Sequence, residues 1–357
     1  MNVCFIAHGD ADRGMGHVMR CIALAEALES IGVESFFISE GERAQKIIKG
    51  KGFQVIPIKT KLVAPRNSMF WYGDKKELNK EIEIVEKILS VNNRINLTII
   101  DTYNVSNQYF RMIKQYSDLV CYVDDLNAFN YDVDIILNGT LGAYNLDYQW
   151  FEKMLLKGLN YLLLRKEFWN IPQIVINKKI KNVLITTGGA DPDNMTNKII
   201  EAIYDEHLQE TNIHLMIGSG FNNISFLQNK WGEKGNVKIH LFPNRIAPLM
   251  LKCDLAVSAG GTTVYELGVC QVPTIAFVYA KNQEGHIRKL YEQGLIEYVG
   301  PSSNWNKEVF KTKYKELSMN FDKREKMARK FRTLVTGNGA INAAERMIAE
   351  IKKTKQR

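Results

Sequence analysis

The stretch IKNVLITTGGADPDNMTNKIIEAI, residues 180–203, repeats the order of elements with which the chain begins. It passes from an apolar run through a glycine turn and a polar loop to a segment of helical spacing, and residues 2–28 begin in the same way with NVCFIAHGDAD. An apolar run followed by a helix is the unit from which parallel sheets are built. The recurrence therefore predicts two α/β domains of similar size.

Further apolar runs extend this pattern through most of the chain. Strands are predicted at residues 34–39, 53–58, 97–101, 119–125 and 134–139, and again at residues 213–218, 237–242, 255–260 and 274–279. Pro172 and a polar NKK run mark a linker, which places the domains at residues 1–168 and 178–335 and a basic helix at residues 336–357. A chain of 357 residues exceeds the usual size of a single core, which agrees with two domains.

The composition is that of a globular protein without disulfides. The first ten residues, MNVCFIAHGD, lack the basic start and cleavage site of a signal peptide, so we expect a first strand and a cytoplasmic protein. The five cysteines are scattered among apolar neighbours without a C-x-x-C pair. This spacing favours buried thiols and argues against both a disulfide framework and a cysteine zinc site.

The net charge of +8 is concentrated at the end of the chain. Residues 305–357 contain 15 Lys and Arg against six Asp and Glu, so the rest of the chain is close to neutral. Much of this tail has helical spacing, which favours solvated helix faces over a nucleic-acid groove. We therefore expect no nucleic-acid partner and no membrane span, with peripheral attraction of the tail to a membrane as the main alternative. We expect a monomer.

Neither glycine turn matches a known nucleotide fingerprint. GMGHVM, residues 14–19, is not G-x-G-x-x-G, and no G-x-x-x-x-G-K-[ST] occurs, so a nicotinamide cofactor and a P-loop are both unsupported. No cofactor is expected. Ligands of parallel sheets nevertheless bind beyond the carboxyl ends of the strands, where loops meet helix N-termini that favour anions.

His17 is the candidate catalytic residue of the first loop. Gly14 and Gly16 allow the backbone to pass close to a ligand, and His17 follows them at the start of a helix. A helix N-terminus disfavours an added positive charge, which keeps an imidazole neutral and able to accept a proton. A capping or core histidine is the alternative, and the position after the first strand favours a function.

The second half contains a candidate nucleotide site. Gly260 and Gly261 follow a strand, Thr262 and Thr263 can cap the next helix, and Glu266 lies one turn inside it. Hydroxyl and backbone N–H groups suit a diphosphate, and a carboxylate suits the hydroxyls of a ribose. The alternative is an ordinary capped helix. TTGGADPDN, residues 186–194, forms a second glycine turn in the same domain.

The adjacent acids Asp124 and Asp125 suggest a cation site at first sight. They end a predicted strand in CYVDDLNAF, and neighbouring side chains of a strand point in opposite directions, which makes a poor chelate. We expect the pair to cap the following turn, and we expect no metal site.

Taken together, several motifs resemble a known family. They are GMGHVMRCIALAEAL, IIDTY, YVDDL, LNYLLLRKEF, TTGGADPDNMT and SAGGTTVYELGVCQVPTIAFVYAKNQ, which occur in order within residues 1–295. As a set they are similar to the UDP-2,4-diacetamido-2,4,6-trideoxy-β-L-altropyranose hydrolases of pseudaminic acid biosynthesis and to relatives in spore-coat polysaccharide synthesis. That resemblance implies a GT-B-like fold, in which two Rossmann-like domains face each other across a cleft.

The resemblance also implies roles for individual residues. Three positions match the family's catalytic histidine, its active-site tyrosine and a residue contacting the sugar: His17, Tyr103 and Asn282. Other positions match residues that bind substrate or nucleotide: Gly14, Gly16, Arg20, Gly188, Gly189, Gly261, Thr262, Thr263, Glu266 and Gln283. The implied reaction is hydrolysis of the UDP-sugar to free sugar and UDP, with His17 as general base and no metal.

The first strand departs from the family pattern. An arginine and an aspartate usually end that strand, whereas this chain has Ile6, Ala7 and His8. Either His8 takes over the polar role, or the substrate is a different nucleotide-sugar. A glycosyltransferase that uses a UDP-sugar donor is the closest alternative function, since the same donor site serves water or a sugar hydroxyl. A sugar-nucleotide binding protein without catalysis is the third.

Overall fold

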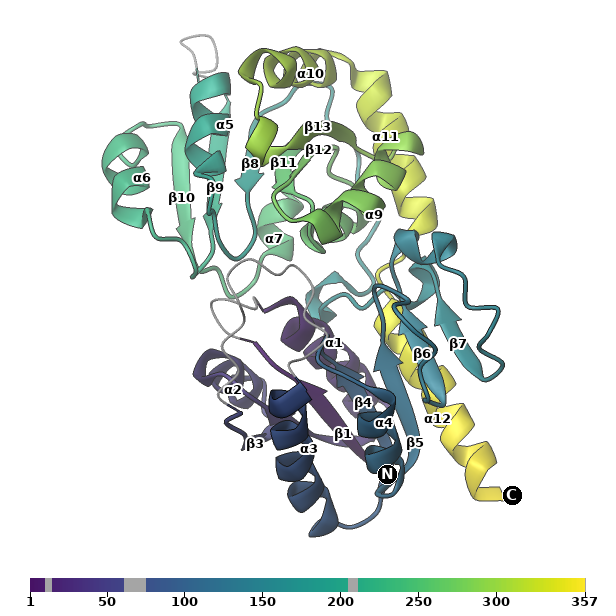
Figure 1. Cartoon of the computed structure of the whole chain (residues 1–357). Helices are drawn as coiled ribbons and strands as arrows, with labels where there is room; N and C mark the ends of the chain where they lie inside the picture. The colour runs from purple at the N-terminus through teal and green to yellow at the C-terminus, as the bar shows by residue number, and fades with distance from the viewer. Residues whose placement is uncertain (10–14, 61–74, 205–210, 357) are drawn as a thin grey trace. The chain divides into compact units, whose positions relative to one another are not determined.

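A computed structural model describes the chain except residues 10–14, 61–74, 205–210 and 357 (Figure 1). The chain divides into two compact units. Unit 1 comprises Met1–Lys166 together with Asn338–Arg357, and unit 2 comprises Glu167–Gly337. The chain therefore leaves unit 1 once and returns to it with its C-terminal helix. Within the described residues, no helix combines the length and apolarity needed to cross a bilayer.

Unit 1 is built on a parallel sheet of seven strands in the order β3-β2-β1-β4-β5-β6-β7. The strands are β1 (Asn2–Ala7), β2 (Glu34–Ser39), β3 (Gln54–Pro57), β4 (Ile95–Asp101), β5 (Ser117–Val123), β6 (Ile135–Asn138) and β7 (Met154–Lys157). The helices are α1 (Gly16–Ser30), α2 (Glu42–Gly50), α3 (Lys75–Ser90), α4 (Asn107–Lys114) and α12 (Gly339–Gln356), with short 3-10 turns η1 (Leu141–Asn145) and η2 (Leu159–Tyr161).

Helix α1 is buried on more than one face. Its sequence predicts one buried stripe, formed by Val18, Cys21, Ile22 and Ala25, but every residue from 21 to 28 is buried. The reason is α12, which packs against α1. Small buried residues of α12, including Ala340, Ala343 and Ala344, allow the two helices to approach closely. The basic C-terminal helix is thus an integral layer of unit 1.

Unit 2 repeats the architecture with six parallel strands in the order β10-β9-β8-β11-β12-β13. The strands are β8 (Asn182–Thr186), β9 (Asn212–Ile217), β10 (Val237–Leu241), β11 (Leu255–Ala259), β12 (Thr274–Val278) and β13 (Glu297–Pro301). The helices are α5 (Met195–Ile203), α6 (Ile224–Trp231), α7 (Ala247–Met250), α8 (Thr263–Val269), α9 (Lys281–Glu292), α10 (Lys307–Met319) and α11 (Phe321–Leu334), with η3 (Lys166–Phe168) and η5 (Ser302–Asn304).

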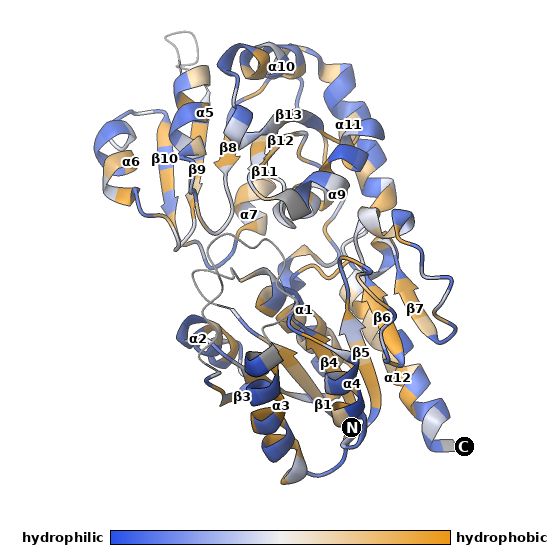
Figure 2. Ribbon diagram, in the orientation of Figure 1, coloured by the Kyte–Doolittle hydropathy of each residue, from blue (hydrophilic) through white to orange (hydrophobic). Residues whose placement is uncertain are grey.

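Each unit has its own apolar core against its sheet. The strands are mainly hydrophobic, whereas the helices alternate hydrophobic and hydrophilic residues, as helices with one buried face do (Figure 2). The predicted fold class, two α/β domains with parallel sheets, is confirmed. Two strands, β7 and β13, were not predicted, and both lie at a sheet edge, where only part of the strand is buried.

The strand order determines where ligands can bind. In unit 1 the chain runs outward from β1 to β3 and then returns to the other side of β1 with β4, and unit 2 makes the same reversal between β8 and β11. Loops on either side of such a reversal leave a crevice at the carboxyl ends of the two strands. Two strand ends are therefore the first places to look for a site: β1/β4 and β8/β11.

Candidate active site

The loops that follow β1 and β4 bring their polar side chains to one strand end of unit 1. Ala7 lies opposite Asp101 where the two parallel strands end. Helix α1 begins at Gly16 after the first strand, and Tyr103 follows the second by two residues. His17, Asp101 and Tyr103 are therefore in contact, although 84 positions separate the first two.

His17 forms a short hydrogen bond with a buried carboxylate. Its Nδ1 lies 2.6 Å from Oδ1 of Asp101, which is fully buried, whereas 17% of the His17 side chain is exposed. Arg20 Nη2 lies 3.2 Å from the same nitrogen, but a carboxylate can only accept, so we assign the Nδ1 proton to the bond with Asp101. In the neutral ring, Nε2 then holds the lone pair, and it has no hydrogen-bond partner among the described residues.

Arg20 joins Asp101 to a second carboxylate, Asp125. Its Nε and Nη2 donate to Asp101 at 2.6 and 2.7 Å, and its Nη1 and Nη2 donate to Asp125 at 2.9 Å each. Burial acts to raise the pKa of both aspartates, but the charge of Arg20 outweighs it and lowers both pKa values. Burial alone would lower the pKa of Arg20, which the two aspartates raise instead. All three groups are therefore charged at neutral pH.

Tyr103 completes this cluster from the loop after β4. Its hydroxyl donates to Asp125 Oδ2 at 3.0 Å, and its ring packs edge to face with His17 at a centroid distance of 4.8 Å. Burial, followed by the charge of Asp125, raises the pKa of Tyr103 well above its usual value. The phenol therefore stays protonated and acts as a hydrogen-bond donor.

The two adjacent acids have different surroundings. Asp124 caps the turn, as predicted, because its carboxylate accepts from the backbone N–H groups of Leu126 and Asn127 at 2.9 Å. For Asp125 the prediction is wrong, since this side chain pairs with Arg20 and Tyr103 instead. Among the described residues, no three His, Cys, Asp or Glu side chains are grouped in a way that could hold a metal ion.

His8 is engaged inside unit 1. It is 3% exposed, its Nδ1 accepts from the backbone N–H of Glu40 at 3.0 Å, and its Nε2 donates to Glu81 Oε1 at 3.2 Å. Glu81 is itself fully buried and also accepts from the Tyr109 hydroxyl at 3.0 Å. Both ring nitrogens of His8 are thus occupied by protein groups, so the hypothesis that His8 takes over the polar role of the family's first-strand residues is not supported.

Unit 2 presents backbone rather than side chains at its equivalent strand ends. Gly188, after β8, has a φ of +83°, a conformation that glycine adopts without strain. A Cβ on Gly218, after β9, would lie 2.4 Å from the Gly188 carbonyl oxygen, so these loops pack backbone to backbone. A Cβ on Gly188, Gly189 or Gly261 would meet nothing within 4 Å, so their backbones border open space.

The start of α8 differs in detail from the prediction. Thr262 is the N-cap residue, but no side-chain hydrogen bond caps the helix, because its φ and ψ of −57° and −25° are already helical. Thr263 is the first residue of α8, and Glu266 lies one turn in with 4% exposure. The predicted residues therefore occupy one strand–helix junction, with their hydroxyls not used for capping.

The remaining predicted residues, near the starts of α9 and α1, have no described contact that indicates a role. Gln283 is buried in the first turn of α9, where its Oε1 accepts from the Tyr279 backbone N–H at 3.2 Å. Asn282 belongs to α9, but its side chain is outside the described residues, as is the whole of Gly14. Gly16 begins α1, and a Cβ there would meet nothing within 4 Å.

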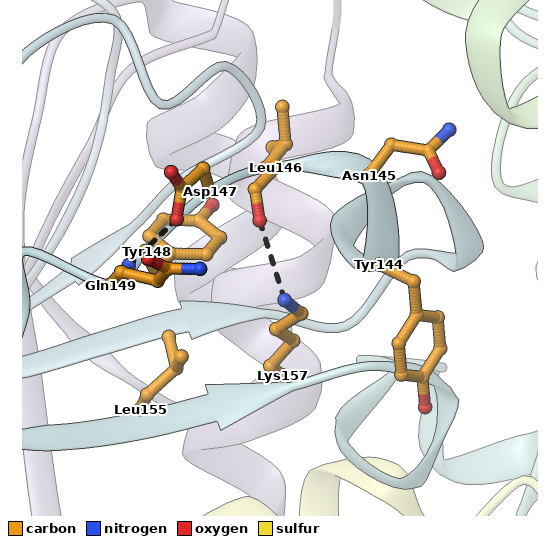
Figure 3. Close-up of a pocket in the computed structure, with 8 residues that line it drawn as sticks. All are labelled: Tyr144, Asn145, Leu146, Asp147, Tyr148, Gln149, Leu155 and Lys157. Carbon is orange, nitrogen blue, oxygen red and sulfur yellow. Dashed lines mark hydrogen bonds between the residues drawn. The ribbon is translucent and has the colours of Figure 1, made fainter.

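A separate pocket lies beside β6 and β7 (Figure 3). It has a volume of about 480 Å³ and is lined by Tyr144, Asn145, Leu146, Asp147, Tyr148, Gln149, Leu155 and Lys157. Lys157 Nζ donates to the Leu146 carbonyl at 3.3 Å and lies 5.6 Å from the ring centroid of Tyr148. None of the predicted site residues lines this pocket, but the Tyr148 hydroxyl donates to Asp124.

Sequence reasoning missed Asp101 and Asp125 as members of the cluster and assigned Arg20 to substrate. An acid that ends a buried strand directly before Tyr103 was a usable signal for Asp101, because strand ends are where ligands bind in such sheets. Asp125 also follows a buried strand, but the sequence predicts a turn cap there, and nothing local indicates its partner Arg20, 105 positions away.

One known family is similar to part of the chain. Residues 182–347 match the glycosyltransferase family 28 C-terminal domain. The matched residues include both glycine loops of unit 2.

Three relatives are similar to this chain in sequence. The chain is 26% identical to the uncharacterised protein MJ1062 of Methanocaldococcus jannaschii over 77% of its length and 55% of that protein. It is 23% identical to the spore coat polysaccharide biosynthesis protein SpsG of Bacillus subtilis, over 96% of both chains. It is 24% identical to the Helicobacter pylori pseudaminic acid cytidylyltransferase and UDP-2,4-diacetamido-2,4,6-trideoxy-β-L-altropyranose hydrolase, over 78% of this chain and 44% of that one. The chain thus spans about half the length of the first and third relatives.

Solved structures of glycosyltransferases share the fold. MurG of Acinetobacter baumannii has a TM-score of 0.65 at 13% identity, over 98% of this chain and 99% of that one. The calicheamicin glycosyltransferase CalG4 has a TM-score of 0.67 at 13% identity, over 99% and 98%. Both likenesses concern the fold alone.

Proposed function

We propose that this chain, which contains a glycosyltransferase family 28 C-terminal domain over residues 182–347 and has SpsG and the H. pylori hydrolase among its homologues, is an enzyme that acts on nucleotide sugars in surface-glycan biosynthesis. Both strand-end loops favoured by the fold bear groups that suit such a substrate. Unit 1 supplies titratable side chains, and unit 2 supplies glycine backbone and hydroxyls.

Within this class we propose hydrolysis. The substrate is a UDP-linked diacetamido-trideoxy sugar, the compound in the name of the H. pylori relative. Water attacks the anomeric carbon, the bond from that carbon to the diphosphate oxygen breaks, and UDP leaves with the bonding electrons. The proton of the attacking water passes to His17 Nε2, and the products are free sugar and UDP.

The observation that supports this role is the bond between His17 Nδ1 and Asp101. A general base needs a free lone pair and a fixed orientation, and a buried carboxylate on the opposite nitrogen provides both. Asp101 also stabilises the imidazolium that forms when His17 takes the proton. The pair therefore has the geometry of an oriented imidazole base.

Arg20 and Tyr103 receive roles around this pair. Arg20 binds both oxygens of Asp101 and so fixes the carboxylate that orients His17, which makes it a positioning residue rather than the substrate ligand that the sequence predicts. Tyr103 packs against the ring of His17 and limits its rotation. The contact of Asn282 with the sugar stays a prediction from the family resemblance.

UDP binding is proposed for unit 2. The exposed backbones of Gly188, Gly189 and Gly261 border open space, where N–H groups can donate to phosphate oxygens. Glu266, buried one turn into α8, suits the ribose hydroxyls. Thr262 and Thr263 are available to the diphosphate because neither hydroxyl caps the helix.

A glycosyltransferase is the second candidate, and the family 28 match favours it. The same base serves that reaction, since it deprotonates a sugar hydroxyl in place of water. The two candidates differ only in the acceptor.

The deciding experiment measures UDP and free sugar by NMR from a panel of UDP-N-acetylated sugars without acceptor. The parent is compared with His17→Ala and with Tyr116→Phe, which removes a tyrosine–carboxylate contact elsewhere in unit 1. Release by the parent and by Tyr116→Phe, with loss in His17→Ala, is the expected result.

Other outcomes contradict the proposal in different ways. Turnover only after a sugar acceptor is added selects the glycosyltransferase. Binding of UDP-sugars without turnover under either condition selects a binding protein. Equal turnover in His17→Ala removes the proposed base.

A further inference from the structure

The turn after β5 holds the side chain that completes the cluster around Arg20. Asp125 is the second residue after β5, and its carboxylate accepts hydrogen bonds from both Arg20 and Tyr103. The hydrogen bonds that the described residues make with Asp125 are to its side chain. The backbone of the turn is bonded instead to the neighbouring Asp124.

Asp124 accepts hydrogen bonds from four different donor groups. It is fully buried, and its two oxygens accept from the backbone N–H groups of Leu126 and Asn127 and from the hydroxyls of Tyr131, at 2.8 Å, and Tyr148. Two backbone donors shape the turn, and two phenols, from residues 7 and 24 positions further along the chain, attach it to the rest of unit 1. A buried carboxylate with four donors is held in one place from several directions.

The same turn is held from its other side by Asn127. This residue adopts a positive φ of 48°, its Nδ2 donates to the Asp147 carbonyl at 2.6 Å, and its Oδ1 accepts from Trp150 Nε1 at 3.2 Å. The Tyr131 hydroxyl that donates to Asp124 also accepts from the Ala128 backbone N–H at 2.7 Å. The turn therefore depends on residues 131–150, the segment that also forms much of the pocket in Figure 3.

We propose that Asp124, held by Tyr131 and Tyr148, is a positioning residue that sets Asp125 against Arg20 and Tyr103. The inference rests on the proposed function for its kinetic readout. A shift of about 1 Å in an orienting group can cost about 100-fold in rate. The chain of contacts runs from the two phenols to Asp124, through one peptide to Asp125, and then to the guanidinium that fixes Asp101.

The test uses the double variant Tyr131→Phe/Tyr148→Phe in the full chain. It removes two donors from Asp124 while keeping both rings, which belong to or border an aromatic cluster with Tyr122, Phe129 and Trp150. Tyr116→Phe is the matched control, because its hydroxyl also donates to a carboxylate, Glu86, in the same unit. Thermal unfolding of both variants reports general loss of stability.

Two readouts are needed. Crystal structures report whether Asp125 keeps its contacts with Arg20, and turnover of the UDP-sugar identified above reports the consequence. We expect the double variant to lose the Arg20–Asp125 pair and to turn over between about 10 and 100 times more slowly, with UDP affinity within twofold of the parent. Tyr116→Phe should match the parent in both readouts.

The outcomes separate this inference from the proposed function. An intact Arg20–Asp125 pair in the double variant overturns the positioning role, whatever the activity. A displaced Asp125 with full turnover overturns it as well. If the parent turns over no UDP-sugar, the proposed function fails, while the crystal structures still decide whether Asp124 positions Asp125. If the double variant does not fold, Tyr148→Phe alone, which keeps three of the four donor groups, is tested for the same displacement.

Discussion

The two units share a topology and differ in what they place at the strand ends. At β1/β4 of unit 1, five side chains interlock: His17, Arg20, Asp101, Tyr103 and Asp125. At β8/β11 of unit 2, glycine backbones border open space and hydroxyls are not used for capping. One fold therefore provides a charged cluster suited to moving a proton and a bare backbone suited to phosphates. Variants can test whether these roles are truly separate.

The largest effect is expected from His17→Ala. Loss of the proposed general base should lower turnover by about 1,000-fold, while UDP affinity stays near that of the parent. Steady-state kinetics and calorimetric titration with UDP check the two parts. A parallel loss of UDP affinity would mean that unit 1 also binds the nucleotide and would remove the division of roles.

Asp101→Asn should affect both turnover and stability. The change leaves the partly buried Arg20 with one counter-ion and replaces one carboxylate oxygen with an N–H₂ donor, so position 101 can no longer accept from His17 and Arg20 through two charged oxygens. We therefore expect a loss of about 3 kcal/mol in unfolding free energy and about 100-fold in turnover. Denaturant unfolding measures the loss of unfolding free energy, and steady-state kinetics measures the loss of turnover. Asp118→Asn, which breaks a pair with the exposed Arg94, is the control and should cost less than about 1 kcal/mol. Equal losses in the two variants would contradict the importance of the buried cluster.

Unit 2 has its own titrating group, placed away from the strand ends. His214 in β9 lies 2.9 Å from His240, and burial, followed by the charges of His240, Lys238 and Lys252, lowers the pKa of His214 to about 4. The unfolded chain, with a usual histidine pKa near 6.5, binds this proton first. The contribution of neutral His214 to the unfolding free energy of unit 2 is therefore fully present above about pH 6.5. It is lost progressively as the pH falls towards 4.

Between about pH 6.5 and 5 this one group should cost the parent roughly 2 kcal/mol. Hydrogen exchange of β9 amides measures the effect, and His214→Gln should reduce the pH dependence by that amount. Near pH 8, where His214 is neutral in both the folded and the unfolded chain, the pH dependence of β9 amide exchange should be the same in the parent and the variant. If the unfolding free energy of the variant fell with pH between 6.5 and 5 as steeply as that of the parent, other groups would be responsible for the acid sensitivity.

The smallest effect is expected from a single methyl group. Gly261→Ala places its Cβ in open space, so stability should not change, while UDP affinity should fall about tenfold, or roughly 1.4 kcal/mol, if phosphates approach this backbone. Gly50→Ala, at the end of α2 in unit 1, also places its Cβ in open space and is the matched control, with UDP affinity unchanged. Calorimetric titration distinguishes the pair, and equal affinities in both variants would place the phosphates elsewhere.

The same contrast explains what the sequence could predict. Strands, glycine turns and the start of α1 follow from local patterns, so the fold class and the position of His17 were accessible. The glycine loops of unit 2 were accessible for the same reason, because each is one continuous motif. Edge strands β7 and β13 were not, since they are only partly buried and lack a full apolar run.

The partners of His17 required the structure. Asp101 and Asp125 lie 81 and 105 positions from Arg20, and only the pairing of β1 with β4 and of β4 with β5 brings them together. Nor could the pattern of α1 reveal that a second helix covers it. Pairings between distant segments leave no periodic trace in a single sequence.

The covering of α1 by α12 has a consequence for the order of events at the ribosome. Helix α1 is among the first elements to emerge, and it is apolar on the face that α12 later covers. Residues 339–356 are synthesised only after all of unit 2 has been made. After Lys166 has been made, unit 1 therefore waits, with part of α1 uncovered, through the translation of residues 167–337, and this interval is when the nascent protein most needs protection from aggregation.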